Sequence, residues 1–193
     1  MVGRPLGRKS GQEVGLAASQ IGLFLAAFVA GGAIAQYPTG WLADKYDRRW
    51  VLIWLSVASV LSCAVTVAAS GLGTVSVMAS AAFFGFTTFP VYSVAASHAH
   101  DFATNEERIE LSAALMFFYA VGAIAAPWVT SLLIETFGPA ALFYFISLGH
   151  IALVVFGLSR MRVRDTIEDK TPYVYAPRTS FIIGRLLGRS RDR

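Results

Sequence analysis

The sequence predicts an all-α integral membrane protein, a polytopic bundle of five transmembrane helices. Apolar residues make up 55% of the 193 residues, and charged residues only 15%, against roughly 25% in an average soluble protein. A charged side chain costs about 2.5 to 3.5 kcal/mol at the centre of a spanning helix, so long uncharged stretches are typical of membrane proteins. Such stretches lie between Glu13 and Asp44, Arg49 and Asp101, Glu110 and Glu135, and Glu135 and Arg160.

Each predicted helix is a run of about 20 mostly apolar residues, which crosses a bilayer at a rise of about 1.5 Å per residue. The first helix covers 19–37 and is followed by a charged connection, 44–49. The second covers 50–70 and ends at an uncharged turn that contains Gly. The third covers 75–96 and leads into a second charged connection, 97–110.

The fourth predicted helix covers 111–134 and the fifth 139–158, and the turn between them carries one acid and no base. Lys and Arg therefore gather at alternate connections and in the tail, 160–193, which has eight Arg and one Lys against four acids. By the positive-inside rule this side of the membrane is cytoplasmic. We expect a basic cytoplasmic tail, either as a short interfacial helix on anionic lipid or as an irregular segment.

The leader, residues 1–15, contains Arg4, Arg8 and Lys9, although five spans would place it outside the cell. One interpretation is that a few basic residues are tolerated there. We favour another, in which one more spanning helix precedes the transmembrane bundle, residues 16–159. The basic leader would then stand in place of a missing helix.

Residues 40–49 read GWLADKYDRR and lie between the first two predicted helices. Gly40 permits close backbone approach, and the carboxylate of Asp44 can accept hydrogen bonds from backbone or Arg groups at a helix end. We expect Arg48 and Arg49 to hold this connection at the headgroups. The segment resembles the signature motif of the major facilitator superfamily, G-x-L-x-D-[RK]-x-G-R-[RK].

Lys45 also matches this signature motif, whereas Asp47 stands where the family has Gly. Asp is one of the few residues that tolerate a positive φ, if this position requires one. The resemblance covers about 16–162 and is similar to the YcaD-type branch of bacterial transporters. Matching segments are QYPTG at 36–40, GFTTFPV at 85–91, and YAVG at 119–122 followed by Pro127.

The resemblance implies that the five helices are the eighth to twelfth of a twelve-helix transporter, an incomplete C-terminal six-helix half without the seventh helix. In such a protein two six-helix bundles rock about a central substrate site in the bacterial inner membrane, and the signature motif acts near the cytoplasmic gate. Thr88, Tyr92 and Tyr119 are then the expected lining of the solute path. Each could equally be structural, because Tyr and Thr often bond to neighbouring helices.

Small residues four apart share one helix face and let helices approach closely in lipid. Gly31, Gly85 and Gly122 each belong to such a pair, and we expect them at helix contacts. Pro90 and Pro127 lie inside predicted helices, where a missing N–H and a clash with the preceding turn produce kinks.

The resemblance implies alternating-access transport of an unidentified small solute, as part of a longer or paired protein. The alternative is a transport-incompetent fragment or membrane interaction subunit, which could pair with a separately encoded N-terminal half or with itself. A third hypothesis is a metal-dependent membrane enzyme built on His98, His100 and Asp101. Two His that flank one residue rarely suffice for a metal site.

We therefore expect no enzyme activity, no catalytic residue, no metal and no cofactor. Nucleic-acid binding is also not expected, because the net charge of +4 arises mainly at connections and in the tail. Cys63 is the single cysteine and lies in an apolar run, so we expect it to pack rather than to form a disulfide. The predicted spans contain no Asp, Glu, Lys or Arg, which leaves no obvious proton relay in this segment.

Overall fold

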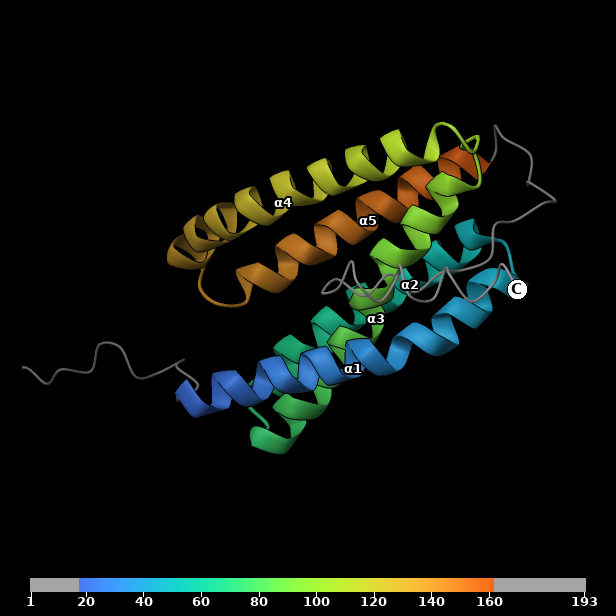
Figure 1. Ribbon diagram of the computed structural model, residues 1–193. Coiled ribbons are helices and arrows are strands. Elements are labelled where there is room, and N and C mark those ends of the chain that lie inside the picture. Colours follow the sequence, from blue (N-terminus) through green and yellow to red (C-terminus); the bar gives the residue numbers. More distant parts are fainter. Residues whose placement is uncertain (1–17, 162–193) are drawn as a thin grey trace, which may run out of the picture.

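The computed structural model describes residues 18–161 as five helices joined by short connections (Figure 1). The helices are α1 (Ala18–Lys45), α2 (Arg48–Ala69), α3 (Thr74–His100), α4 (Arg108–Phe137) and α5 (Ala141–Met161). All five are long and apolar enough to cross a membrane, and no strand occurs between residues 18 and 161. The predicted all-α fold class is confirmed. The leader, 1–15, and the tail beyond Met161 lie outside the described residues.

Each helix extends beyond the apolar run that predicted it on at least one side, although α5 begins at Ala141 rather than 139 and α2 ends at Ala69 rather than 70. α1 continues to Lys45, past Pro38, whereas the sequence predicted its end at residue 37. The expected charged connection 44–49 is therefore mostly helical, and only Tyr46 and Asp47 separate α1 from α2. An apolar run marks the part of a helix in hydrocarbon, while the helix itself can continue into the headgroup region, where water can satisfy its last backbone groups.

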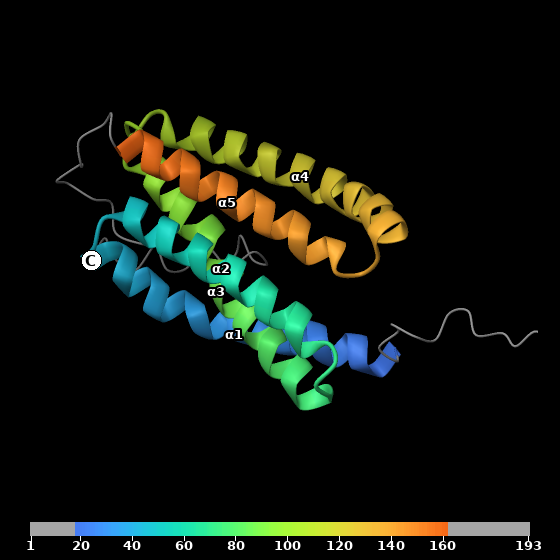
Figure 2. The same cartoon turned by 180° about the vertical axis from the view of Figure 1, so that it is seen from behind.

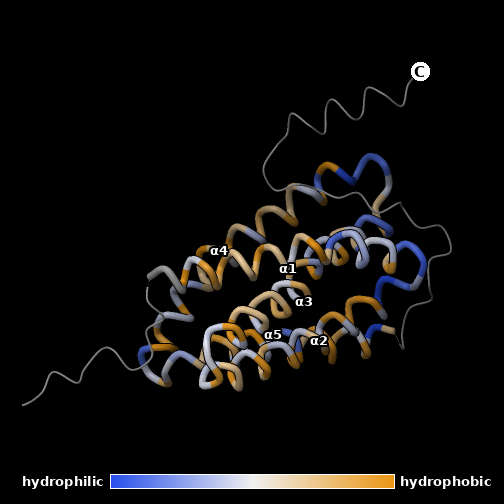
Figure 3. The backbone as a smooth tube through the Cα atoms, turned by 90° about the horizontal axis from the view of Figure 1, so that it is seen from below, coloured by the Kyte–Doolittle hydropathy of each residue, from blue (hydrophilic) through white to orange (hydrophobic). Residues whose placement is uncertain are grey.

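Charged residues gather at one end of the bundle, which we call the charged end: residues 44–49, 97–110 and Arg160. α1, α3 and α5 end there, and α2 and α4 begin there (Figure 1). Along their lengths the helices are mainly hydrophobic (Figure 3). This pattern fits helices that cross a bilayer with their polar ends at its surfaces.

In both views of the ribbon α1 lies apart from α4 and α5, and α2 lies between α1 and α5 (Figures 1 and 2). α1 packs mainly on α3, and α2 packs on α3 and on α5. α4 lies beside α5 at the edge, with few contacts to α5 and α3. No residue of α4 is buried along Arg108–Phe137.

The contact between α1 and α3 depends on two glycines. A Cβ atom at Gly31 would overlap the backbone carbonyl of Ala82, and a Cβ atom at Gly85 would overlap that of Phe28. Backbones that approach so closely gain dispersion contacts, which are a main source of helix association in lipid. The expected packing role is thus met for these two glycines, which lie one on each helix.

The other predicted packing residues behave differently. Pro90 is buried inside α3, whereas Pro127 is exposed inside α4. A Cβ atom at Gly122 would meet nothing within 4 Å, so this glycine makes no close contact with the described helices. The expectation of a helix contact at Gly122 is not met within this bundle, because no other described helix covers that part of α4.

Hydroxyl groups connect α2 to α3 inside the bundle. The hydroxyls of Ser62 and Thr87 lie 3.0 Å apart, and both residues are buried. Thr66 donates to the backbone oxygen of Ser62 at 2.8 Å and lies 3.5 Å from that of Ser80. Such bonds hold neighbouring helices together where lipid offers no alternative partner.

Candidate functional site

Arg48 of the signature motif connects three helices at the charged end. Arg48 is the first residue of α2, and its side chain is only 1% exposed. Nη1 lies 2.5 Å from Oδ1 of Asp101 and donates to the carbonyl oxygen of Ser97 at 3.1 Å, both near the end of α3. Nη2 donates to Oδ1 of Asp44 on α1 at 3.1 Å. We call Arg48, Asp44, Asp101 and the Ser97 carbonyl the Arg48 network.

The environment of the two carboxylates differs. Asp101 is 5% exposed, whereas Asp44 is 45% exposed. A guanidinium group presents its donors in a planar fork, so Arg48 can bond to acceptors on α1 and α3 at once. The predicted Asp44 interaction with Arg is present. The Arg48 side chain is buried among the helix ends, and the expected place of Arg48 and Arg49 at the headgroups stays a prediction.

Asp47 caps α2 and holds Arg49. Its Oδ1 accepts from the backbone N–H of Arg49 at 2.9 Å, which satisfies one of the unpaired donors at the helix start. The Arg49 guanidinium donates back to the same carboxylate, with Nη2 and Oδ2 2.9 Å apart. The φ angle of Asp47 is −62°, so this position requires no positive φ. Asp replaces the family Gly as a helix cap.

The remaining motif residues lie on the last turns of α1. Gly40 is buried, consistent with close backbone approach. The ammonium group of Lys45 lies 4.8 Å from the ring centroid of Trp41 and 5.6 Å from that of Tyr46. Both distances are within the range of cation–π attraction. Lys45 therefore contacts aromatic rings at the position where a membrane surface is expected.

Two of the three expected solute-path residues, Tyr92 and Tyr119, contact each other between α3 and α4. The rings of Tyr92 and Tyr119 lie 5.3 Å apart, centroid to centroid, in a tilted arrangement. Thr88, one turn before Tyr92, bonds through its hydroxyl to the carbonyl of Phe84 within its own helix. These three residues line neither of the two cavities described below. Their role in a solute path stays a prediction.

Two acids near the start of α4, Glu107 and Asp101, have partners close by. Thr104 donates its backbone N–H and its hydroxyl to Oε2 of Glu107, each at 2.9 Å. The Glu107 N–H donates to the Thr104 hydroxyl at 3.4 Å, which completes the reciprocal pattern of a capping box. The two bonds to the carboxylate lower the pKa of Glu107, first through the backbone N–H and then through the hydroxyl. Asp101 pairs with Arg48, as described above.

Between residues 18 and 161, no group of three or more His, Cys, Asp or Glu is placed to hold a metal ion, so the described residues do not support the metal hypothesis. Nδ1 of His98 is 4.0 Å from Oδ2 of Asp101, whose other oxygen contacts Arg48. His100 lies 3.4 Å from the hydroxyl of Ser112. The two histidines therefore have different polar neighbours, Asp101 for His98 and Ser112 for His100.

Sequence reasoning missed two residues. His150 lies midway along α5, is 7% exposed, and its Nδ1 has no hydrogen-bond partner among the described residues. The absence of Asp, Glu, Lys and Arg from the spans says nothing of His, so the sequence pattern gave His150 no role. Asp101 entered the prediction as a possible metal ligand. Its charge complementarity to a motif Arg at the same membrane surface was the available signal.

Comparison with known proteins gives the family. A profile of the Major Facilitator Superfamily matches residues 9–190. An uncharacterized MFS-type transporter of Yersinia pestis (strain Pestoides F) is 31% identical over 160 residues, 82% of this chain and 39% of that protein. The uncharacterized MFS-type transporter YcaD of Salmonella arizonae is 31% identical over 162 residues, 83% of this chain and 40% of that protein.

A third relative, an uncharacterized MFS-type transporter of Enterobacter sp. (strain 638), is 29% identical over 162 residues, 84% of this chain and 40% of that protein. The chain thus spans about two fifths of the length of these relatives. The profile match covers both the signature motif and all five membrane-length helices. This chain is an integral membrane protein of the major facilitator superfamily.

Proposed function

We propose that the chain forms part of a secondary transporter that moves a small solute across the membrane by alternating access. The observation that carries this proposal is the Arg48 network, in which the signature motif joins α1, α2 and α3 at one end. A rocking bundle must move as a unit, and a buried Arg shared by three helices fixes their relative positions. The signature motif then stabilises one side of the gate.

The five helices are proposed to be the eighth to twelfth of a twelve-helix protein, the greater part of its C-terminal half. Support comes from the relatives, of which the chain spans about two fifths, and from α4, which has no buried residue. In this arrangement α4 faces the central cavity and the helices that complete it. Tyr92 and Tyr119 contact each other between α3 and α4, Thr88 lies one turn before Tyr92, and all three are proposed to line the path.

Transport is tested by uptake into reconstituted vesicles. The chain alone is compared with the chain reconstituted together with the N-terminal segment of the YcaD relative, using radiolabelled sugars, amino acids and organic cations. We expect uptake only with the added segment, and a lower rate with Tyr119→Phe. Uptake by the chain alone would disprove the need for further helices. Absence of uptake by the pair across all solutes would count against transport.

The charged end is proposed to be cytoplasmic, which places the tail in the cytoplasm of a bacterial inner membrane. Single cysteines at Ala103, in the charged end, and at Gly71, in the opposite turn, test this in a Cys63→Ser background. A membrane-impermeant maleimide added to spheroplasts, which lack the outer membrane, should label the cysteine at 71 and spare the one at 103. The reverse pattern would overturn the orientation.

The second candidate function is a membrane interaction subunit without transport activity of its own. The same α4 helix favours it, because a wholly unburied helix provides a face for another transmembrane segment. The partner would be a separately encoded N-terminal half or a second copy of this chain. Cross-linking from a cysteine at Gly122 distinguishes the two: a dimer of the chain indicates self-association, and a larger mixed product indicates the other half.

A further inference from the structure

A cavity of about 310 Å³ opens at the charged end, outside the contact between Tyr92 and Tyr119 that is proposed for the solute path. It lies between α2, the end of α3, and α5. Most of its lining is apolar, with Leu52, Ile53, Leu153 and Phe156 among the contributors. A cavity with this lining binds a molecule with a substantial apolar part.

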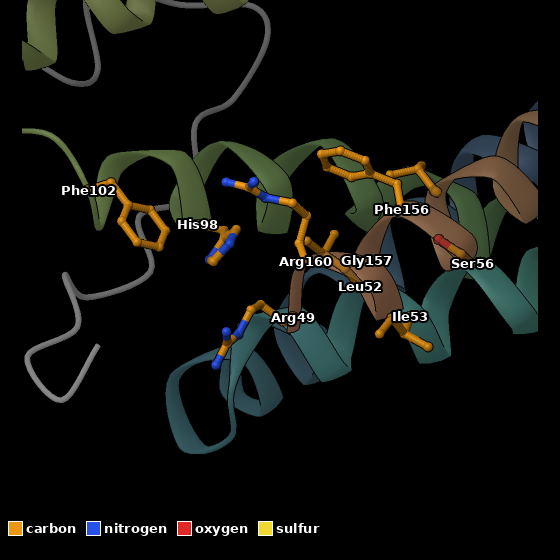
Figure 4. A pocket seen from close by; sticks show the side chains of 10 residues that line it. Arg49, Leu52, Ile53, Ser56, His98, Phe102, Phe156, Gly157 and Arg160 are labelled. Atoms are coloured by element: carbon orange, nitrogen blue, oxygen red, sulfur yellow. The ribbon is translucent and has the colours of Figure 1, made fainter. Parts of the chain in front are cut away.

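Cationic side chains lie at one side of this cavity. The nitrogen-bearing ends of Arg49 and Arg160 flank the His98 ring, on the side away from Ser56 (Figure 4). Arg49 pairs with Asp47, and Arg160 adds a second positive charge in the last turn of α5. None of the described lining residues is acidic, although Asp47 pairs with Arg49 and Asp101 lies 4.0 Å from His98 just outside the lining. Arg160 forms no ion pair with a described acid, so its charge makes the mouth favourable for an anion.

Ser56 provides a polar group deeper in the cavity. Its hydroxyl is buried and has no hydrogen-bond partner among the described residues. Other hydroxyls on α2, those of Ser59 and Thr66, donate to a carbonyl one turn earlier in the helix. Figure 4 shows the Ser56 oxygen directed toward the other lining side chains. This donor is available to an acceptor on a bound molecule.

A second cavity of about 190 Å³ between α2 and α5 lies farther from the charged end and is lined only by aliphatic residues. Its α5 residues, Ile151, Val154 and Val155, lie on another face of that helix than Leu153 and Phe156, so the two cavities are separate. The first cavity therefore combines cationic side chains at its mouth, the Ser56 hydroxyl and an apolar wall.

We propose that the cavity at the charged end binds an anionic phospholipid. Its phosphate lies at Arg49 and Arg160, an ester oxygen accepts from the Ser56 hydroxyl, and the first part of an acyl chain packs against the apolar wall formed by Leu52, Ile53, Leu153 and Phe156. A phospholipid carries these three kinds of group next to one another. A free anion would leave the apolar lining unused. The basic tail beyond Arg160, with seven Arg and one Lys against four acids, would be repelled by the mouth.

The test uses native mass spectrometry of the full chain released from nanodiscs that contain equal amounts of phosphatidylglycerol and phosphatidylcholine. We expect retained phosphatidylglycerol in excess. Arg160→Gln should reduce that excess about fivefold, from about 1 kcal/mol per basic residue near an anionic surface, and Arg160→Lys should preserve it. Lys45→Gln, at the same end but outside the cavity, is the matched control and should leave the preference unchanged.

Ser56→Ala should weaken retention of both lipids, because it removes the donor to an ester group that they share. An equal loss of preference in Arg160→Gln and Lys45→Gln would show a general surface charge effect and overturn the proposal. So would undiminished preference in Arg160→Gln. Displacement of the lipid by inorganic phosphate at equal concentration would show a site for free anions, and would also overturn it.

Discussion

The Arg48 network predicts a graded loss of stability when its two carboxylates are neutralised one at a time. Asp101→Asn should lower the free energy of unfolding by about 3 to 5 kcal/mol, because it leaves a buried guanidinium without its least exposed anionic partner. Asp44→Asn should cost about 1 kcal/mol or less, since that carboxylate is 45% exposed and water screens the pair. The value for Asp101→Asn corresponds to a change of about 10²- to 10⁴-fold in the unfolding equilibrium constant. The value for Asp44→Asn corresponds to a change of at most about tenfold.

The assay is equilibrium unfolding of the purified chain in mixed micelles with increasing dodecyl sulfate. Trp41 and Trp50 lie close to Asp44 and Arg48 in the sequence, so tryptophan fluorescence reports on the charged end once Trp54 and Trp128 are replaced by Phe. Circular dichroism reports on total helix. Glu135→Gln is the matched control, because this acid lies in the last turn of α4, away from the charged end, and is exposed. It should change the free energy of unfolding by less than about 0.5 kcal/mol.

A double substitution tests whether the cost comes from an unpaired buried charge. Arg48→Met combined with Asp101→Leu removes both charges and keeps apolar volume, so it should be more stable than Asp101→Asn alone. Equal destabilisation by Asp44→Asn and Asp101→Asn would refute the reasoning from burial. An additive double substitution would show that the two residues do not interact.

Two further predictions concern helix contacts and pH. Gly31→Val should cost about 1 to 3 kcal/mol by overpacking against Ala82, whereas Gly122→Val should change stability little, both measured by the same unfolding assay. The depressed pKa of Glu107 means that its cap with Thr104 contributes fully above the unfolded pKa of about 4.3 and is lost as pH falls through the lower folded pKa. Amide exchange at 104–108, corrected for intrinsic rates, should quicken there; unchanged protection would contradict the cap.

The sequence was sufficient for the fold class and for the order of the five helices. Uncharged stretches have a direct physical cause in the cost of charge in hydrocarbon, so their number and position follow from composition alone. Helix ends at the charged end were predicted too short, because residues such as Gly40 and Asp44 are helical yet lie outside the apolar run. Hydropathy measures the membrane part of a helix and not the helix itself.

The site was only partly predictable. The motif indicated that Asp44 would bond to an Arg, but the partner that is more deeply buried, Asp101, is 53 residues from Arg48 in the sequence. Which helix end packs against which depends on the crossing at Gly31 and Gly85, a three-dimensional property. Hydrophobic patterns predict that a helix exists, but they do not give its neighbours, because lipid-facing and buried surfaces are both apolar.

The distribution of contacts divides the bundle into a fixed and a less constrained part. α1, α2 and α3 are joined at the charged end by Arg48, and α1 crosses α3 at two glycines. α4 has no such crossing; its contacts include Ser112 with His100 near its start, Tyr119 with Tyr92, and a small contact with α5.

A helix held by few contacts has a low cost of displacement, and functional motion draws on such elements. Among the described helices, α4 is therefore the one that we expect to be displaced most easily from the group formed by α1, α2 and α3. Weakening the Arg48 network would loosen that rigid group rather than α4. Asp101→Asn should accordingly increase amide exchange at the end of α3 and the start of α2, and leave exchange at the centre of α4 unchanged. Faster exchange confined to α4 would show that the network restrains α4 instead.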